Sequence, residues 1–228
     1  MTGPAYFITG TDTEIGKTTL SSVIIRALVA KGFRTAAMKP VAAGAVMVDG
    51  VLHNEDVDAL VSAANVSLPT GLVCPYLLRT PVSPNLSASQ DGRTIDIPHI
   101  VDCYRKIRQK AEAVIVEGVG GFLVPFSRNT SSADLAEQLG LPVIMVVGLK
   151  LGCISHALLT AEAVRARGLT LAGWIANRVN PDMAFSDGNI ETLENWLEAP
   201  RLGTMPYLKS FEGAGHYLDL SLLPGWPK

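Results

Sequence analysis

The segment 10–19 has the residue types and spacing of a phosphate-binding loop. It reads Gly-Thr-Asp-Thr-Glu-Ile-Gly-Lys-Thr-Thr and directly follows the apolar run Tyr6-Phe7-Ile8. In such a loop, backbone N–H groups point at phosphates, the lysine adds a positive charge, and the hydroxyl after it can ligate magnesium. A plain strand-to-helix turn is the alternative, but helical periodicity over 18–31 begins just where phosphate binding requires a helix. We therefore expect a triphosphate site at Lys17 and Thr18.

The loop also departs from the usual pattern. Five residues instead of four separate Gly10 from Gly16, and two of them, Asp12 and Glu14, are acidic. Carboxylates next to phosphates repel them unless a cation lies between. We therefore expect these acids to meet the metal, its waters or a cationic side chain.

Other polar residues follow the remaining apolar runs. Glu117 ends one run and precedes Gly118-Val119-Gly120-Gly121, which suits a magnesium ligand, although a solvated strand-end acid would look the same. Asp56 precedes a helical pattern and is either a metal ligand or an N-cap or first-turn charge. Lys39 stands before Pro40 and either reaches into a ligand crevice or is solvated.

Lys150 lies where another loop meets a helical pattern. The segment Gly152-Cys153-Ile154-Ser155 follows it. The start of that helix could bind a second anion, such as a substrate carboxylate, or it could simply be N-capped by Ser155. The residues alone leave these two interpretations open.

Short apolar runs alternate with amphipathic stretches along the chain. Strands are predicted at 6–9, 35–38, 113–116, 143–147 and 171–176, with a possible last strand at 202–205, and helices at 18–31, 56–64, 97–110, 132–139, 155–167 and 190–197. This alternation predicts an α/β fold with a mostly parallel sheet and helices on both faces. Ligands then collect beyond the carboxyl ends of the strands. The irregular stretch 67–93 is expected to lie over that edge.

Composition limits the class of protein. The 228 residues fit a single domain over 1–228, and 48% hydrophobic residues supply a core. The net charge is −2 and no basic run occurs, which disfavours nucleic-acid binding. No apolar segment is long enough for a membrane span, and the amino terminus does not look like a leader. Three widely spaced cysteines suit reduced thiols, so we expect a cytoplasmic protein.

Four further motifs, taken with the loop, resemble the dethiobiotin synthetase family. They are Lys-Pro-Val-Ala-Ala-Gly, Val-Glu-Gly-Val-Gly-Gly, Val-Gly-Leu-Lys-Leu-Gly-Cys-Ile-Ser-His-Ala and Ala-Gly-Trp-Ile-Ala-Asn, in that order along the chain, with Met205-Pro206-Tyr207 after them. The resemblance covers nearly the whole chain and implies a P-loop NTPase-like fold. It also implies an ATP- and magnesium-dependent ring closure, in which 7,8-diaminononanoate, carbon dioxide and ATP give dethiobiotin, ADP and phosphate.

The resemblance also assigns roles to residues. Lys17 and Lys39 would be catalytic, and Thr18, Asp56 and Glu117 would hold magnesium. The nucleotide would contact Thr13, Glu14, Ile15, Gly16, Lys17, Thr18, Thr19, Asp56, Glu117, Gly118, Val119, Gly120, Asn177, Arg178, Pro206, Tyr207, Leu208 and Glu212. The substrate would contact Lys39, Ala43, Gly118, Lys150, Gly152, Cys153 and Ile154, with its carboxylate bound across a homodimer interface.

One position departs from the family pattern. Many relatives have a hydroxyl residue where Ala43 stands, so a neighbouring N–H or a water would have to replace that hydrogen bond. Two other functions were weighed. A partitioning ATPase commonly has a second lysine within its phosphate loop, and 11–15 has none. A cobyrinate-type amide-forming enzyme needs a glutamine-hydrolysing domain, for which the chain is too short.

Overall fold

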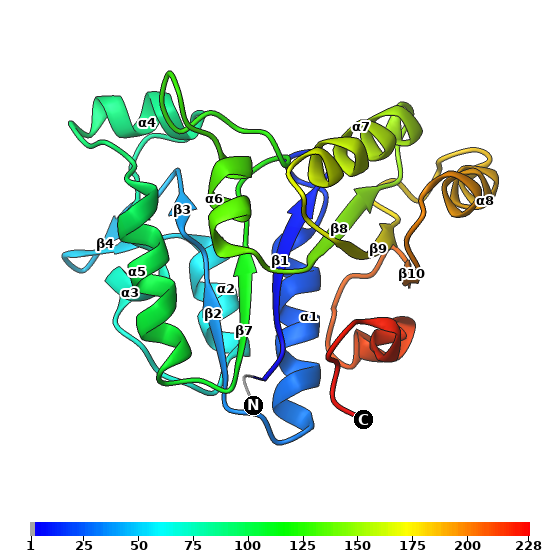
Figure 1. Ribbon diagram of the computed structural model, residues 1–228, viewed down its shortest axis with the longest axis horizontal. Coiled ribbons are helices and arrows are strands. Elements are labelled where there is room, and N and C mark those ends of the chain that lie inside the picture. Colours follow the sequence, from blue (N-terminus) through cyan, green and yellow to red (C-terminus); the bar gives the residue numbers. More distant parts are fainter. Residues whose placement is uncertain (1–2) are drawn as a thin grey trace.

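Six parallel strands form the central sheet, in the order β10-β9-β8-β1-β7-β2 (Figure 1). The computed structural model describes residues 3–228. The strands are β1 (Ala5–Gly10), β2 (Thr35–Met38), β7 (Ala113–Glu117), β8 (Val143–Gly148), β9 (Leu171–Asn177) and β10 (Arg201–Met205). All neighbouring strands pair in parallel, which confirms the predicted α/β class. Every predicted strand is present, the possible last one included.

Helices cover both faces of this sheet (Figure 1). The main helices are α1 (Lys17–Ala30), α2 (Glu55–Ala63), α5 (Ile97–Arg108), α6 (Ser132–Leu139), α7 (Cys153–Ala166) and α8 (Ser186–Trp196). Side chains alternate along β1, so that Tyr6 and Ile8 share a buried cluster with α1 and α2, whereas Phe7 belongs to the cluster under α5, α6, α7 and α8. Burial on both faces explains why the strands read as continuous apolar runs.

The segment between β2 and α5 is more structured than the sequence indicates. It contains the short parallel pair β3 (Val41–Ala42) and β6 (Tyr76–Leu77), the antiparallel hairpin β4 (Val46–Val48) and β5 (Val51–His53), and the helices α3 (Thr70–Val73) and α4 (Pro84–Gln90). The expectation that 67–93 is irregular throughout is therefore wrong. After β10, two 3-10 turns, η1 (Ala214–Tyr217) and η2 (Leu220–Leu222), pack on the α1 face of the sheet.

Two helices begin two or more residues earlier than predicted. Helix α8 begins at Ser186, four residues before the predicted start, and α7 begins at Cys153. Gly152 is the N-cap of α7, with a left-handed φ of 92°, and no side chain caps the helix. The alternative in which Ser155 caps this helix is therefore wrong, because Ser155 already lies in the first turn.

Candidate active site

The loop between β1 and α1 presents backbone donors without acceptors. No hydrogen-bond acceptor among residues 3–228 takes the N–H groups of residues 14–19. Gly16 caps α1 in the left-handed region, with φ 86°, and offers no side chain. Glu14 also has a positive φ, of 55°. A run of unpaired donors at the start of a helix is an anion site, since the helix dipole adds to the hydrogen bonds.

Glycines let this loop fold back on itself. A Cβ on Gly10 would lie 2.6 Å from Cδ1 of Ile15, and one on Gly16 would lie 2.3 Å from Nδ2 of Asn177. The Asn177 amide occupies that space because its Nδ2 donates to the carbonyl of Ile15 at 2.7 Å. Asn177, at the end of β9, thus holds the loop from the side.

Lys17 is buried beneath this loop. Its Nζ donates to the backbone carbonyl of Asp12 at 2.6 Å. Burial, and next the nearby charge of Lys39, lower the pKa of Lys17 to about 8. Phosphate oxygens would therefore stabilise the charged form of Lys17 more than its present surroundings do.

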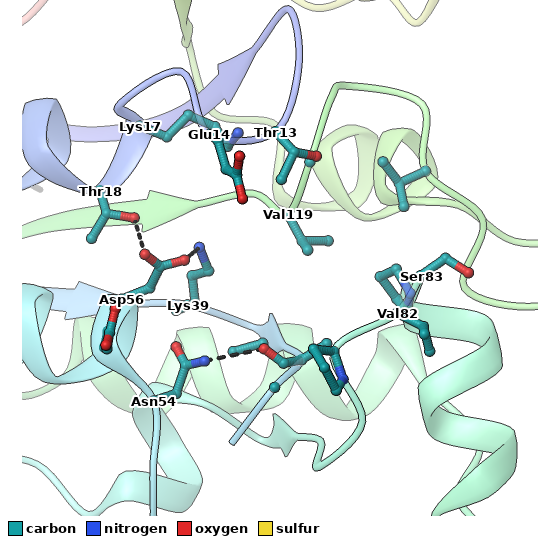
Figure 2. A pocket seen from close by; sticks show the side chains of 18 of the residues that line it. Thr13, Glu14, Lys17, Thr18, Lys39, Asn54, Asp56, Val82, Ser83 and Val119 are labelled. Carbon is teal, nitrogen blue, oxygen red and sulfur yellow. Dashed lines mark hydrogen bonds and ion pairs between the residues drawn. The ribbon is translucent and has the colours of Figure 1, made fainter. Parts of the chain in front are cut away.

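Four side chains from different parts of the fold meet beside Lys17, and Figure 2 shows Thr18, Lys39 and Asp56 of this group. The Thr18 hydroxyl lies 2.7 Å from Oδ1 of Asp56 and 2.8 Å from Oε1 of Glu117. Nζ of Lys39 lies 2.7 Å from Oδ2 of Asp56 and 2.5 Å from the same Glu117 oxygen. Residues distant in sequence, from α1, α2, β7 and the end of β2, thus meet at the predicted edge of the sheet.

Two charged side chains of this cluster are buried, and removing their charges from water costs free energy unless they are paired. The side chain of Glu117 is fully buried and that of Lys39 is 4% exposed. Burial alone would lower the pKa of Lys39, but the charges of Glu117 and Asp56 outweigh it, so the net shift is upward. Partial burial would raise the pKa of Asp56, but the Lys39 charge outweighs it and the net shift is downward. Lys39 is thus not a solvated lysine, nor Glu117 a solvated acid.

The cluster also fits a hard cation. One hydroxyl proton of Thr18 faces two carboxylate oxygens, and Oε2 of Glu117 is buried without a hydrogen-bond partner in the part of the chain that the structure describes. Such an oxygen set is what magnesium prefers. Within residues 3–228 no group of three or more His, Cys, Asp or Glu side chains could hold a metal, so a site here depends on the threonine.

Asp56 does not cap its helix. Asn54 is the N-cap of α2, and its Oδ1 accepts from the N–H of Val57 at 3.3 Å. The Nδ2 of Asn54 donates to the carbonyl of Ala43 at 3.1 Å. Asn54, which the sequence analysis did not single out, therefore fixes both the start of α2 and the Ala43 backbone.

A cavity of about 960 Å³ opens in front of the cluster. One side is polar and includes Lys17, Thr18 and Lys39, whereas Val82 and Ser83 lie across from them (Figure 2). The Ser83 hydroxyl has no hydrogen-bond partner among the described residues, although Ser83 is the N-cap of α4. Apolar and small residues complete the lining: Ala42, Ala43, Val46, Pro81, Pro84, Val119 and Val124.

Comparison with known proteins decides the family. The family described as "AAA domain" matches residues 4–214. A curated relative from Janthinobacterium sp. (strain Marseille), "ATP-dependent dethiobiotin synthetase BioD", is 54% identical over 97% of this chain and 97% of its own length. This chain belongs to the dethiobiotin synthetase family. The predicted resemblance is confirmed.

Solved structures with low sequence identity show that this chain has the P-loop NTPase fold. The cell division protein MinD of Aquifex aeolicus has a TM-score of 0.59 at 16% identity, over 93% of this chain and 86% of its own. The septum site-determining protein MinD of Pyrococcus horikoshii OT3, complexed with Mg-ADP, has a TM-score of 0.57 at 17% identity, over 99% and 88%. These identities support the fold alone. None of the helices in residues 3–228 is long and apolar enough to cross a membrane.

The structure distributes the remaining predicted site residues over the edge of the sheet. Thr13, Glu14, Thr19, Val119 and Gly120 line the cavity. Gly118 follows β7, where its N–H bonds the carbonyl of Ile8 at 2.9 Å. The stretch with Pro206, Tyr207 and Leu208 lies beside Asn177, since the Arg178 N–H donates to the carbonyl of Met205 at 3.0 Å.

Some predicted residues have other partners. The Arg178 guanidinium contacts Ser186 and lies 2.5 Å from Asp187, at the start of α8. Glu212 is exposed and does not line the cavity. Lys150 pairs with Asp12 at 2.5 Å, so Asp12 meets a cationic side chain, one of the three alternatives left open for it, but the Lys150 ammonium does not line the cavity.

Asn54, Pro81 and Ser83 are among the cavity-lining residues that escaped the sequence analysis. Asn54 lies two residues before the predicted helix 56–64, close to the usual position of an N-cap. Pro81 and Ser83 belong to the stretch 67–93, which was expected to cover this edge. The sequence therefore indicates which segments lie near the site, but not which of their side chains line it.

Proposed function

We propose that this protein is a dethiobiotin synthase that closes the ureido ring of dethiobiotin from 7,8-diaminononanoate, carbon dioxide and ATP. The observation that supports this most is the convergence of Lys17, Thr18, Lys39, Asp56 and Glu117 beside a loop with unpaired N–H groups. A relative of this chain is named a dethiobiotin synthetase, and the proposed reaction explains why these residues would meet at one place.

The proposed reaction has three steps. One substrate amine adds to carbon dioxide and loses a proton, giving an N-carbamate. A carbamate oxygen attacks the γ-phosphorus of ATP, which expels ADP and leaves a carbamic-phosphoric anhydride. The second amine attacks the carbamoyl carbon and loses a proton, and phosphate leaves as the C–N bond and the ring close.

The protein contributes mainly positive charge and position. Lys17 and Lys39 would neutralise the γ-phosphate and the carbamate as negative charge develops, which is the usual basis of catalysis in phosphoryl transfer. Thr18, Asp56 and Glu117 would hold magnesium, which supplies charge neutralisation at the phosphates when bound. Ser83 would offer the hydroxyl that Ala43 lacks, since both residues line the same cavity. Asn177 would present its amide to the adenine.

The direct test is phosphate release measured with and without the diamine. A synthetase releases phosphate only when 7,8-diaminononanoate and bicarbonate are both present. A nucleotide-driven conformational switch, the alternative suggested by the MinD-like fold, would release phosphate at the same rate without the diamine. Diamine-independent release would therefore overturn the proposal.

Glu117→Gln is expected to raise the magnesium concentration needed for half-maximal activity by about 10- to 100-fold. The change replaces an anionic oxygen, in a fully buried side chain, by a neutral amide, which attracts a hard divalent cation less. Activity should recover in part at high magnesium. Titration of activity with magnesium checks this, with Glu191→Gln, an exposed acid on α8, as the control. An identical magnesium dependence in Glu117→Gln and wild type would remove Glu117 from the site.

We also propose a homodimer in which the start of α7 from one subunit receives the substrate carboxylate. Diaminononanoate separates its carboxylate from its amines by several methylenes, so the two ends need separate sites. The N–H groups of Ile154 and Ser155 have no acceptor among the described residues, whereas the Cys153 N–H already donates to the carbonyl of Lys150. Leu151 beside them is 97% exposed, which suits burial against a second subunit.

Leu151→Arg is expected to dissociate this dimer and to raise the KM for the diamine at least tenfold, while ADP affinity stays unchanged. A charge buried in an interface without a partner is strongly unfavourable. Sedimentation and diamine titration check both effects, and Leu222→Arg, an exposed leucine on η2, is the matched control. Gly152→Val is a poorer probe, because the positive φ of Gly152 strains any such side chain. A fully active wild-type monomer would contradict the dimer.

A further inference from the structure

Asp12 makes three contacts, one of which connects the phosphate loop to the segment before α7. Its Oδ2 accepts from Nζ of Lys150 at 2.5 Å, and its Oδ1 accepts from the Thr13 N–H at 2.8 Å. Its backbone carbonyl accepts from Nζ of Lys17 at 2.6 Å. The carboxylate is thus fixed at both oxygens, and the peptide that follows it is fixed with it.

We propose that Asp12 and Lys150 are positioning residues, which hold the phosphate loop in its binding conformation before the nucleotide arrives. The inference rests on the proposed nucleotide role of this loop. Loop residues 13–16 use neither a helix nor a strand for support, and their hydrogen bonds to the rest of the chain are few: Asn177 holds Ile15, and Asp12 holds Thr13. Lys150 therefore provides a second restraint on the loop through Asp12, in addition to the one from Asn177.

The position of the Lys17 ammonium depends on the same contacts of Asp12. When the Asp12 side chain is fixed, the backbone carbonyl of Asp12 is held where it accepts from Nζ of Lys17. This bond keeps the Lys17 ammonium at the base of the loop. A loop free to change conformation would have to be ordered again when the nucleotide binds, and the cost would appear as lower affinity. The effect of Lys150 on catalysis is thus indirect, through the loop.

The geometry argues against Lys150 as the receptor of the substrate carboxylate. Its ammonium is already committed to Asp12, and it does not line the cavity that holds Lys39 and Ala43. Hydrogen bonding from Lys150, followed by that from the Thr13 N–H, lowers the pKa of Asp12, and the charge of His156 contributes less. Asp12 is therefore ionised at neutral pH, as the pair requires.

The test is calorimetric binding of ADP with magnesium, in the absence of the diamine. Both side chains of the pair are 41% exposed, so the expected effect is modest: Lys150→Met should raise the Kd for ADP roughly three- to fivefold. Asp12→Asn should do the same, since it keeps an acceptor for the Thr13 N–H and loses only the charge. Lys150→Arg should stay near wild type. Lys31→Met, an exposed lysine outside the ion pairs of residues 3–228, is the control.

The double variant Asp12→Asn/Lys150→Met distinguishes a shared role from two separate ones. If the residues act through each other, the double variant binds ADP no more weakly than either single variant. Hydrogen exchange should also show faster exchange of the loop amides in nucleotide-free Lys150→Met than in wild type.

Four outcomes would overturn the inference. Unchanged ADP affinity in Lys150→Met with a raised KM for the diamine would make Lys150 a substrate receptor. Losses that multiply in the double variant would show two independent roles. Wild-type protein that binds no ADP would overturn the proposed function as well, whereas wild-type binding with unaffected variants overturns this inference alone.

Discussion

Lys39→Met is expected to lower the rate of dethiobiotin formation at saturating substrates by about 10²–10³-fold, the usual cost of losing one preorganised electrostatic contact. Lys39 stands at the strand end, buried within the cluster that faces the cavity. Methionine fills a similar volume without the charge, so the loss reports charge and not packing. The KM for ATP should change much less than the rate. Near-normal turnover in the purified variant would remove Lys39 from the mechanism.

The same substitution should also make stability depend on magnesium. Without Lys39, the buried carboxylate of Glu117 loses the ammonium that pairs with it, and removing one partner of a buried pair costs about 3–5 kcal/mol. We expect Lys39→Met to melt below wild type in chelator and to regain most of the difference in magnesium. Lys31→Met should show neither effect. A magnesium-independent melting temperature in Lys39→Met would contradict a cation site at these carboxylates.

Gly16→Ala is expected to weaken ADP binding by about 100-fold. Gly16 has φ 86°, where a side chain is strained by about 1–3 kcal/mol, and its Cβ would lie 2.3 Å from Nδ2 of Asn177. That amide cannot move aside without losing its bond to the Ile15 carbonyl. The loop would relax into another conformation, and binding would then have to restore the strained one. Calorimetric titration with ADP and magnesium measures the loss.

Gly32→Ala is the matched control for this prediction. Gly32 has the same φ of 86°, but nothing lies within 4 Å of a Cβ built there. It should show the cost of the backbone conformation in its melting temperature, with ADP affinity unchanged. ADP affinity in Gly16→Ala equal to that in Gly32→Ala would show that the loop need not keep this conformation to bind the nucleotide.

The sheet and the edge that bears the site could be predicted because both depend on local patterns. Continuous apolar runs such as 143–147 mark strands buried on both faces, and parallel strands bring their carboxyl ends to one edge. Lys39 and Glu117 were therefore expected to lie near Thr18 before any contact was known. Asp56 was placed less well, because a first-turn acid needs no partner beyond its own helix.

Other features depend on contacts that no local pattern records. Lys150 lies 138 positions from Asp12, and only the fold brings them together. The hairpin β4–β5 escaped prediction although Asp49-Gly50 is a typical turn pair, because its strands are three residues long and their valines are exposed instead of alternating. The early start of α7 was missed because Gly152, rather than a polar side chain, precedes it.

Formation of the cyclic urea from labelled bicarbonate tests the central claim most directly. The purified protein is incubated with 7,8-diaminononanoate, ¹³C-bicarbonate, ATP and magnesium, and the products are identified by mass spectrometry. The account predicts dethiobiotin with the label at its ureido carbon, together with one ADP for each ring closed, and none of it without ATP. ADP formed without labelled dethiobiotin, or labelled dethiobiotin formed without ATP, would contradict it.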